Sequence, residues 1–274
     1  MILPQFKKTP ILLAFMAINF AFIGVDVLIA HSQNNFFRLE MIPLIYTPFA
    51  VLGILLKLFL PNKRWAHHFF RISMVFGLVI GLLGTFFHLA GNATAKPQPI
   101  YELIVEGSPV AAPIAFAGIA LFTLTAAKSE ISRRNSQLLI LVGLGFLASV
   151  TAAFLDHARL AFSPIYTLFP LISGLMAMIA CFWLAYSKKT KPEVIFFLSI
   201  MALNLFIGLL GFVFHVLGDL AGTQTIVWAR FLYRNPLLGP LLFCDVAMLG
   251  GLSLLPEQFG AARKQPVEKS NLAN

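Results

Sequence analysis

The sequence predicts an all-α, polytopic membrane protein with eight transmembrane helices arranged as two tandem four-helix bundles. Two observations lead to this fold class. The chain of 274 residues is 59% hydrophobic and 11% charged, with a mean hydropathy of +0.86. Its apolar runs reach about 20 residues, the length that crosses a bilayer. The second half of the chain also repeats the first at an offset of 126 or 127 positions.

The apolar runs define the helices, and the basic residues between them define the orientation. Lys and Arg gather in the connections on one side, as at Lys7 and Lys8 and at Arg133 and Arg134. Because cytoplasmic loops carry the basic excess, both termini are predicted to be cytoplasmic, in a bacterial inner (plasma) membrane. This distribution argues against a nucleic acid partner. The predicted helices span residues 10–31, 41–60, 70–90, 109–128, 137–157, 165–187, 194–216 and 236–255.

The repeat is clearest in two segments with the same glycine and histidine pattern. Residues 80–92 read IGLLGTFFHLAGN, and residues 207–219 read IGLLGFVFHVLGD. Each half contains four helices, so the halves share one orientation, as in parallel repeats related by an axis along the membrane normal. The predicted units are two four-helix repeats, at 1–130 and 131–256, followed by a disordered cytoplasmic tail at 257–274.

Both copies place a histidine on a stripe of glycines. Residues four and seven apart share a helix face, so Gly84 and Gly81 lie beneath His88, and Gly211 lies beneath His215. A flat or bulky cofactor could lie against such a stripe, because glycine has no side chain. The alternative is plain packing, since stripes of small residues also let membrane helices approach closely.

Four histidines end the first, third, fifth and seventh predicted helices on the outer side: His31, His88, His157 and His215. Diagonal helices of an up-down-up-down bundle face each other, so these residues form one pair in each half. Two opposed imidazoles are the axial ligands of a bis-histidine haem. The sequence therefore predicts two b-type haems, with Arg159 and Arg230 as partners for their propionates.

Two haems near the outer face indicate electron transfer, with a quinol or a periplasmic electron carrier as partner. The chain would act as an enzyme or as a membrane subunit of a respiratory oxidoreductase. Two alternatives stay open. The same four histidines could bind or transport Cu, Zn or non-haem Fe, because imidazole suits each of these metals. The chain could also be a cofactor-free transporter or assembly subunit whose histidines pack or sense pH.

Few other polar residues occur within the predicted spans. Asp245 lies roughly 14 Å along the last span, and an ionisable residue at such a depth is a functional candidate. The alternative is a neutral Asp245 that forms a hydrogen bond with Asn204 or Asn19. Cys181 and Cys244 lie inside apolar runs, where ordinary packing is expected.

Overall fold

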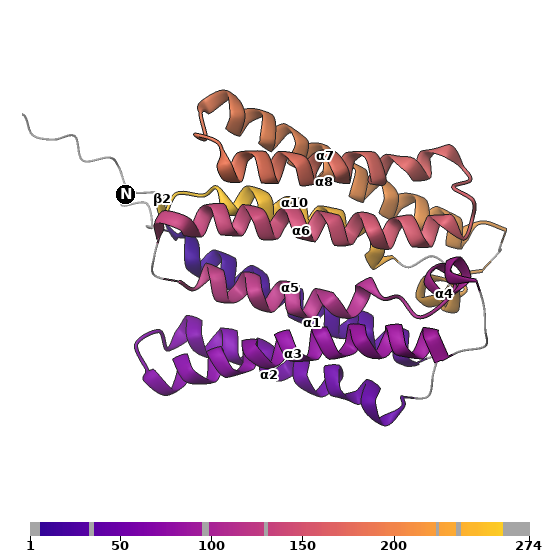
Figure 1. Cartoon of the computed structure of the whole chain (residues 1–274), viewed down its shortest axis with the longest axis horizontal. Helices are drawn as coiled ribbons and strands as arrows, with labels where there is room; N and C mark the ends of the chain where they lie inside the picture. The colour runs from indigo at the N-terminus through magenta and orange to yellow at the C-terminus, as the bar shows by residue number, and fades with distance from the viewer. Residues whose placement is uncertain are drawn as a thin grey trace, which may run out of the picture.

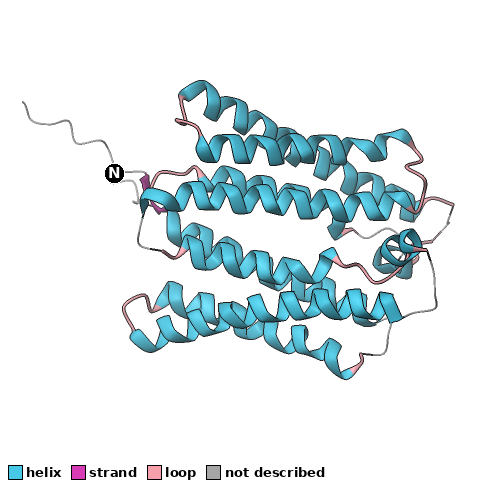
Figure 2. Ribbon diagram, viewed as in Figure 1, coloured by secondary structure: helices cyan, strands magenta, loops and turns pink. Residues whose placement is uncertain are grey.

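The computed structural model is all-helical apart from one pair of two-residue strands, and it describes residues 6–32, 36–94, 99–128, 131–222, 225–233 and 237–259 (Figures 1 and 2). The long helices of this part of the chain are α1 (Lys8–Ser32), α2 (Met41–Phe59), α3 (Arg64–Thr94), α5 (Ala111–Ala126), α6 (Ile131–Ala158), α7 (Phe169–Tyr186), α8 (Lys191–Leu220) and α10 (Leu238–Ser253). The short elements are β1 (Phe6–Lys7), η1 (Arg38–Glu40), α4 (Ile100–Val105), η2 (Ile165–Leu168), α9 (Trp228–Tyr233) and β2 (Gln258–Phe259).

Six of these helices are long and apolar enough to cross a membrane. They are α1, α3, α6 and α8, together with α2 and α7 extended by the 3₁₀ turns η1 and η2 that precede them. The other two long helices, α5 and α10, have 16 residues each and are apolar. They are shorter than the roughly 20 residues that a span requires, so length and composition identify six spans rather than the predicted eight.

Helices α3 and α8 begin before the apolar runs that predicted them. The runs start at residues 70 and 194, whereas the helices start at Arg64 and Lys191. The first turn of α8 has a sequence reason for its position, because Thr190 and Glu193 form a capping box. The carboxylate of Glu193 accepts hydrogen bonds from the backbone N–H and the hydroxyl of Thr190, at 2.6 and 2.9 Å. Hydropathy locates the membrane-crossing part of such a helix and misses its polar first turn.

The long helices form two groups of four. Helices α1 and α3 both contact α2 and α5, so α1 and α3 lie diagonally across the first group. Helices α6 and α8 both contact α7 and α10, which gives the second group the same arrangement. The groups meet where α5 packs against α6 and α1 against α10, and Figure 1 shows these helices in the middle of the molecule.

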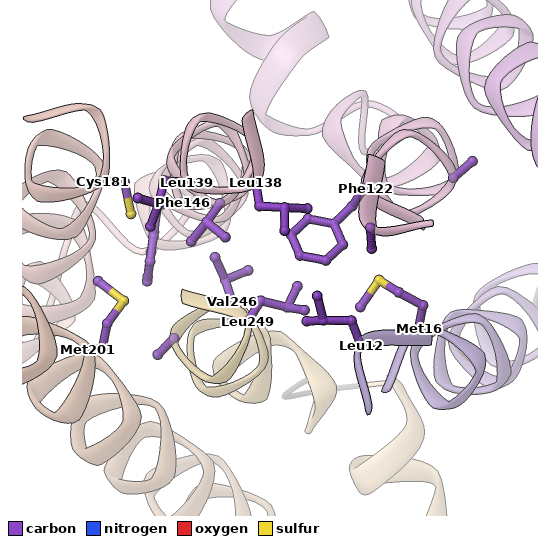
Figure 3. Close-up of a cluster of buried hydrophobic side chains, with 14 of the residues drawn as sticks. Leu12, Met16, Phe122, Leu138, Leu139, Phe146, Cys181, Met201, Val246 and Leu249 are labelled. Atoms are coloured by element: carbon purple, nitrogen blue, oxygen red, sulfur yellow. The ribbon is translucent and has the colours of Figure 1, made fainter. Parts of the chain in front are cut away.

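A continuous hydrophobic core joins the two groups. Leu12 and Met16 of α1 point towards Phe122 of α5, Leu138 of α6 and Leu249 of α10 (Figure 3). All five side chains are buried. The core lies between the groups rather than only within each one, so the described helices pack as one body.

Glycines set the distance between α3 and α5. A Cβ atom built on Gly81 would lie 2.5 Å from the backbone nitrogen of Ala117, and one on Gly84 would lie 2.8 Å from Pro113 Cβ. In the second group, a Cβ on Gly208 would lie 2.8 Å from the Pro240 carbonyl oxygen. Close approach of the two backbones therefore requires glycine at these positions.

Gly81→Ala is expected to destabilise the protein by about 1–3 kcal/mol, because the added methyl group overpacks a backbone contact. Gly91→Ala is the matched control on the same helix, since nothing lies within 4 Å of a Cβ built there. The Gly91→Ala protein should be as stable as the unaltered protein or slightly more stable, because alanine has a higher helix propensity than glycine. Thermal unfolding of the detergent-purified variants, followed by circular dichroism, measures both effects. Equal midpoints for the two variants would contradict the close α3–α5 contact.

The basic end of the helices contains a buried charge cluster formed by Lys8, Arg134 and Glu257. The Lys8 ammonium is fully buried and donates hydrogen bonds of 2.6 Å to Asn135 Oδ1 and to the Ser253 carbonyl. It also lies 3.9 Å from Glu257 Oε1, and Arg134 forms an ion pair with the same carboxylate. The basic residues of the sequence pattern are thus not all at the surface, and this cluster ties both ends of the described chain to α6.

Strands β1 and β2 pair beside this cluster. Phe6 lies opposite Phe259 and Lys7 opposite Gln258, in antiparallel register. The predicted disordered tail starts at residue 257, whereas Glu257 is ion-paired and Gln258–Phe259 form β2. The rest of the predicted tail, residues 260–274, lies outside the described residues.

Candidate functional site

The first histidine pair lies at the end of the bundle opposite the charge cluster. His31 is the penultimate residue of α1, and His88 lies in the last two turns of α3. Because α1 and α3 are diagonal, their side chains meet across the group. The ring centroids of His31 and His88 are 6.5 Å apart, and the ring planes are inclined by 57°.

Hydrogen bonding orients His88 and leaves ring nitrogens of both histidines available. His88 Nδ1 lies 3.0 Å from the carbonyl oxygen of Pro109, in the connection that leads into α5. A carbonyl accepts only, so Nδ1 carries the proton, and Nε2 keeps its lone pair. His31 Nδ1 is buried and has no hydrogen-bond partner. Both rings therefore have a nitrogen atom without a hydrogen bond, at the place where the ends of α1 and α3 meet.

Helix α5 covers the glycine stripe below His88, and an aromatic cluster lies deeper in the group. Phe20, Tyr46 and Phe116 form an aromatic cluster in the centre of the group, with ring centroids 5.9–6.3 Å apart. The Tyr46 hydroxyl donates a 2.9 Å hydrogen bond to the Ser73 carbonyl, and all three rings are buried. Pro113 covers Gly84 on the stripe below His88. A group bound by the histidines could therefore not lie along the glycine stripe.

The second pair occupies the corresponding positions in the other group. His157 is the penultimate residue of α6, and His215 lies in the last two turns of α8. The two rings are close enough to interact electrostatically, and Asp156 interacts with both of them. Gly211 lies under Pro240, where an added Cβ would be 3.0 Å from Pro240 Cβ. The second glycine stripe is thus also covered by a neighbouring helix.

The arginines predicted to meet propionates bind backbone carbonyls. Arg159 Nε donates a 2.6 Å hydrogen bond to the Val105 carbonyl at the end of α4. Arg230 donates from Nη1 to the Ala221 carbonyl at 2.8 Å. Both lie at the same end of the molecule as the histidines, the end where Figure 1 shows α4. These bonds hold the guanidinium groups in place, and Asp156 lies close enough to interact electrostatically with Arg159.

The two polar residues predicted within the spans do not contact each other. Asp245 is half-buried on α10, and its side chain lies close enough to interact with Asn19 of α1, whose amide nitrogen donates a 3.0 Å hydrogen bond to the Phe15 carbonyl. Asn204 is fully buried on α8 and donates to the Ser173 and Ile200 carbonyls, at 3.1 and 3.0 Å. Of the two partners proposed for Asp245, the structure places Asn19 beside it, at the contact between the helix groups.

Few other side chains that could bind a metal ion lie near each histidine pair. Within the described ranges, no group of three or more His, Cys, Asp or Glu side chains could hold a metal ion. Cys181 and Cys244 are buried free thiols, as their apolar surroundings predict. The arrangement can therefore supply two imidazole ligands at one site.

Sequence reasoning missed the contacts that hold the histidine level together. Pro109 marks the start of a predicted helix, yet the structure uses its carbonyl to orient His88. The Tyr101 hydroxyl donates to the Ala158 carbonyl, next to His157, at 3.3 Å. Backbone acceptors carry no sequence signature, but the proline pair Pro109 and Pro113 shows that carbonyls near this helix start lack ordinary helical partners.

Comparison of the chain with protein-family models, with curated proteins and with solved structures finds no match.

Proposed function

We propose that the chain is a membrane protein that binds b-type haem between His31 and His88 and a second haem between His157 and His215. Its role is electron transfer at one face of the membrane, or service as the membrane subunit of a quinol oxidoreductase. The opposed rings of His31 and His88, 6.5 Å apart, carry this proposal. A bound haem would supply a one-electron carrier at the membrane surface.

The separation of the rings fits a shared metal ion. Imidazole–metal bonds are about 2.0–2.1 Å long, so two rings on opposite sides of one ion have their centres roughly 6.4 Å apart. The Pro109 carbonyl supports the same reading, because metal-binding histidines commonly donate their second ring N–H to a carbonyl that fixes the ring. The unpartnered His31 Nδ1 is a buried polar atom that a bound group would explain.

The small number of ligands favours haem over a bare ion. Each site offers two histidines, and no larger ligand group occurs in the part of the chain that the structure describes. Iron in haem takes four nitrogens from the macrocycle and needs two more, whereas a bare zinc ion takes three or four protein ligands. Arg159 and Arg230 are fixed near the histidine level and could pair with propionates.

We further infer that α5 and α10 complete an eight-helix membrane domain built from tandem repeats. Each lies among long helices rather than at the edge of its group, since α5 contacts α1, α3 and α6, and α10 contacts α1, α6 and α8. The matching packing of Gly84 on Pro113 and Gly211 on Pro240 supports a repeat. The basic end then faces the cytoplasm of a bacterial cell, and the histidines face the outside.

A non-haem metal is the second candidate, because carboxylates lie near both pairs. Glu40 interacts electrostatically with His88, and Asp156 interacts with His157 and His215. Two histidine nitrogens with water in the remaining positions could bind Zn, Cu or Fe, and the nearby carboxylate would offset the charge of the ion without binding it directly. In this case the protein would bind or handle the metal rather than carry electrons through haem.

Optical spectroscopy and metal analysis of one preparation separate the two candidates. The full chain, expressed with a haem precursor and purified in detergent, is expected to show a Soret band and about two haems per chain. A colourless protein with about one Zn, Cu or Fe per histidine pair would favour the second candidate instead. A protein that holds neither haem nor metal, also after reconstitution with haemin or metal salts, would contradict both.

A further inference from the structure

Helices α2 and α3 form an exposed apolar surface that the proposed function does not use. A hollow of about 410 Å³ lies between them. Its walls are almost entirely apolar and are formed by Ile42, Ile45, Tyr46, Phe49, Phe69, Ile72, Ser73, Phe76 and Ile80. A second hollow of about 230 Å³ lies along α3 and is lined by Arg71, Ile72, Val75, Phe76 and Val79. Ile72 and Phe76 line both hollows, so they form a ridge with one hollow on each side.

The length of the larger hollow matches one acyl chain of a phospholipid. On α3, the larger hollow extends from Phe69 to Ile80, and 11 residues at 1.5 Å each give about 16 Å. One leaflet contributes about 15 Å of hydrocarbon. A phospholipid has two acyl chains, and the ridge of Ile72 and Phe76 would separate them.

The end of the hollows nearest the start of α3 is strongly basic. Lys57 Nζ lies 3.3 Å from His67 Nδ1, and Arg71 is close enough to interact electrostatically with the same histidine. Lys63 and Arg64 lie in the α2–α3 connection and at the start of α3. No Asp or Glu occurs between residues 41 and 94. Four cations therefore have no acidic partner on their own helix pair, at the level where a lipid head group lies.

We propose that the α2–α3 surface is a binding site for an anionic phospholipid of the leaflet at the basic end. The phosphate lies among Lys57, His67 and Arg71, and the two acyl chains lie on either side of the Ile72–Phe76 ridge. Basic residues between membrane helices attract anionic head groups, and the hollows add contacts for the chains. The site contains none of the four paired histidines, so this proposal does not depend on the proposed haem.

Native mass spectrometry of the detergent-purified full chain tests this proposal. The chain is titrated with phosphatidylglycerol and with phosphatidylcholine that carries the same acyl chains. We expect one phosphatidylglycerol per chain to bind at least tenfold more tightly than phosphatidylcholine. Equal binding of the two lipids would overturn the proposal. Displacement of the bound lipid by glycerol phosphate at a similar concentration would also overturn it, because the acyl chains would then contribute nothing.

Two variants with matched controls locate the site. Arg71→Ala should weaken phosphatidylglycerol binding about fivefold, whereas Lys188→Ala, which removes an exposed cation between α7 and α8, should leave it unchanged. Ile45→Trp places a bulky ring in the larger hollow and should weaken the binding of both lipids. Ile172→Trp, at an equally exposed position on α7, should leave the binding of both lipids unchanged. Equal effects within either pair of variants would place the lipid elsewhere and overturn the proposal.

Discussion

His88→Ala is expected to reduce the haem content of the purified protein from about two per chain to about one. The variant removes the ring that the Pro109 carbonyl orients and leaves His31 with no partner across the group. The second pair, His157 and His215, is formed by other helices and should keep its haem. The remaining haem also shows that the variant folds, because it requires an intact second group of helices.

The control for this variant is another histidine on the same helix. His68 lies exposed near the start of α3, and His68→Ala should retain both haems. Imidazole added to His88→Ala can enter the space left by the side chain and should restore part of the missing haem. The pyridine haemochrome assay and the Soret absorbance measure the stoichiometry. Full haem content in His88→Ala would contradict the pairing of this residue with His31.

Glu257→Gln is expected to destabilise the protein by about 3–5 kcal/mol, the typical cost of leaving buried charges without their partner. The exposed fractions of the Lys8 and Arg134 side chains are 0% and 4%, so both cations would stay buried after the loss of the Glu257 charge. The strands beside the cluster should open in the same variant. The loss should therefore appear both in thermal unfolding and in faster proteolysis of the chain ends.

An exposed glutamate and a compensating variant make this experiment specific. Glu106→Gln at the end of α4 should change the unfolding midpoint little, because surface charges contribute about 0–1 kcal/mol. The double variant Lys8→Met with Glu257→Gln should recover part of the lost stability, since it removes one of the two stranded cations. A Glu257→Gln protein as stable as Glu106→Gln would show that the buried cluster does not hold the ends together.

The apolar runs of the sequence predicted the long helices well, because hydropathy reports directly on what a membrane helix presents to lipid. It could not predict that α5 and α10 have only 16 residues. Both helices begin two residues after a proline, Pro109 and Pro236, inside apolar runs that are longer than the helices. The diagonal placement of His31 and His88 followed from chain order alone, because short connections place consecutive helices side by side.

The charge cluster was harder to predict, although the sequence holds a sign of it. Arg134 lies 126 positions after Lys8, and Glu257 lies 127 positions after Glu130, which is outside the described residues. These are the two offsets of the proposed repeat. Hydropathy treats such residues as solvated connections, since burial of a charge depends on partners that are distant in the chain. The repeat relates these charges in pairs of like sign and does not show which of them meet, so the contacts depend on the packing of the helices.

The glycine stripes are a feature whose role the sequence pattern alone could not decide. A histidine above Gly84 and Gly81 has the same sequence signature whether the glycines face a cofactor or a helix. The choice depends on Pro113 and Ala117 of α5, which cover the stripe. The position of α5 follows from the whole group of helices and is not encoded near the histidine.

The pairing of β1 with β2 has a consequence for the order of the two halves. Phe6 lies opposite Phe259, so a short linker could join these two residues in place of residues 1–5 and 260–274. Opening the chain between Lys128 and Ile131 would then yield a circular permutant in which α6 to α10 precede α1 to α5. Every helix contact would be available to this permutant, so the geometry of the protein does not require that either half be synthesised first.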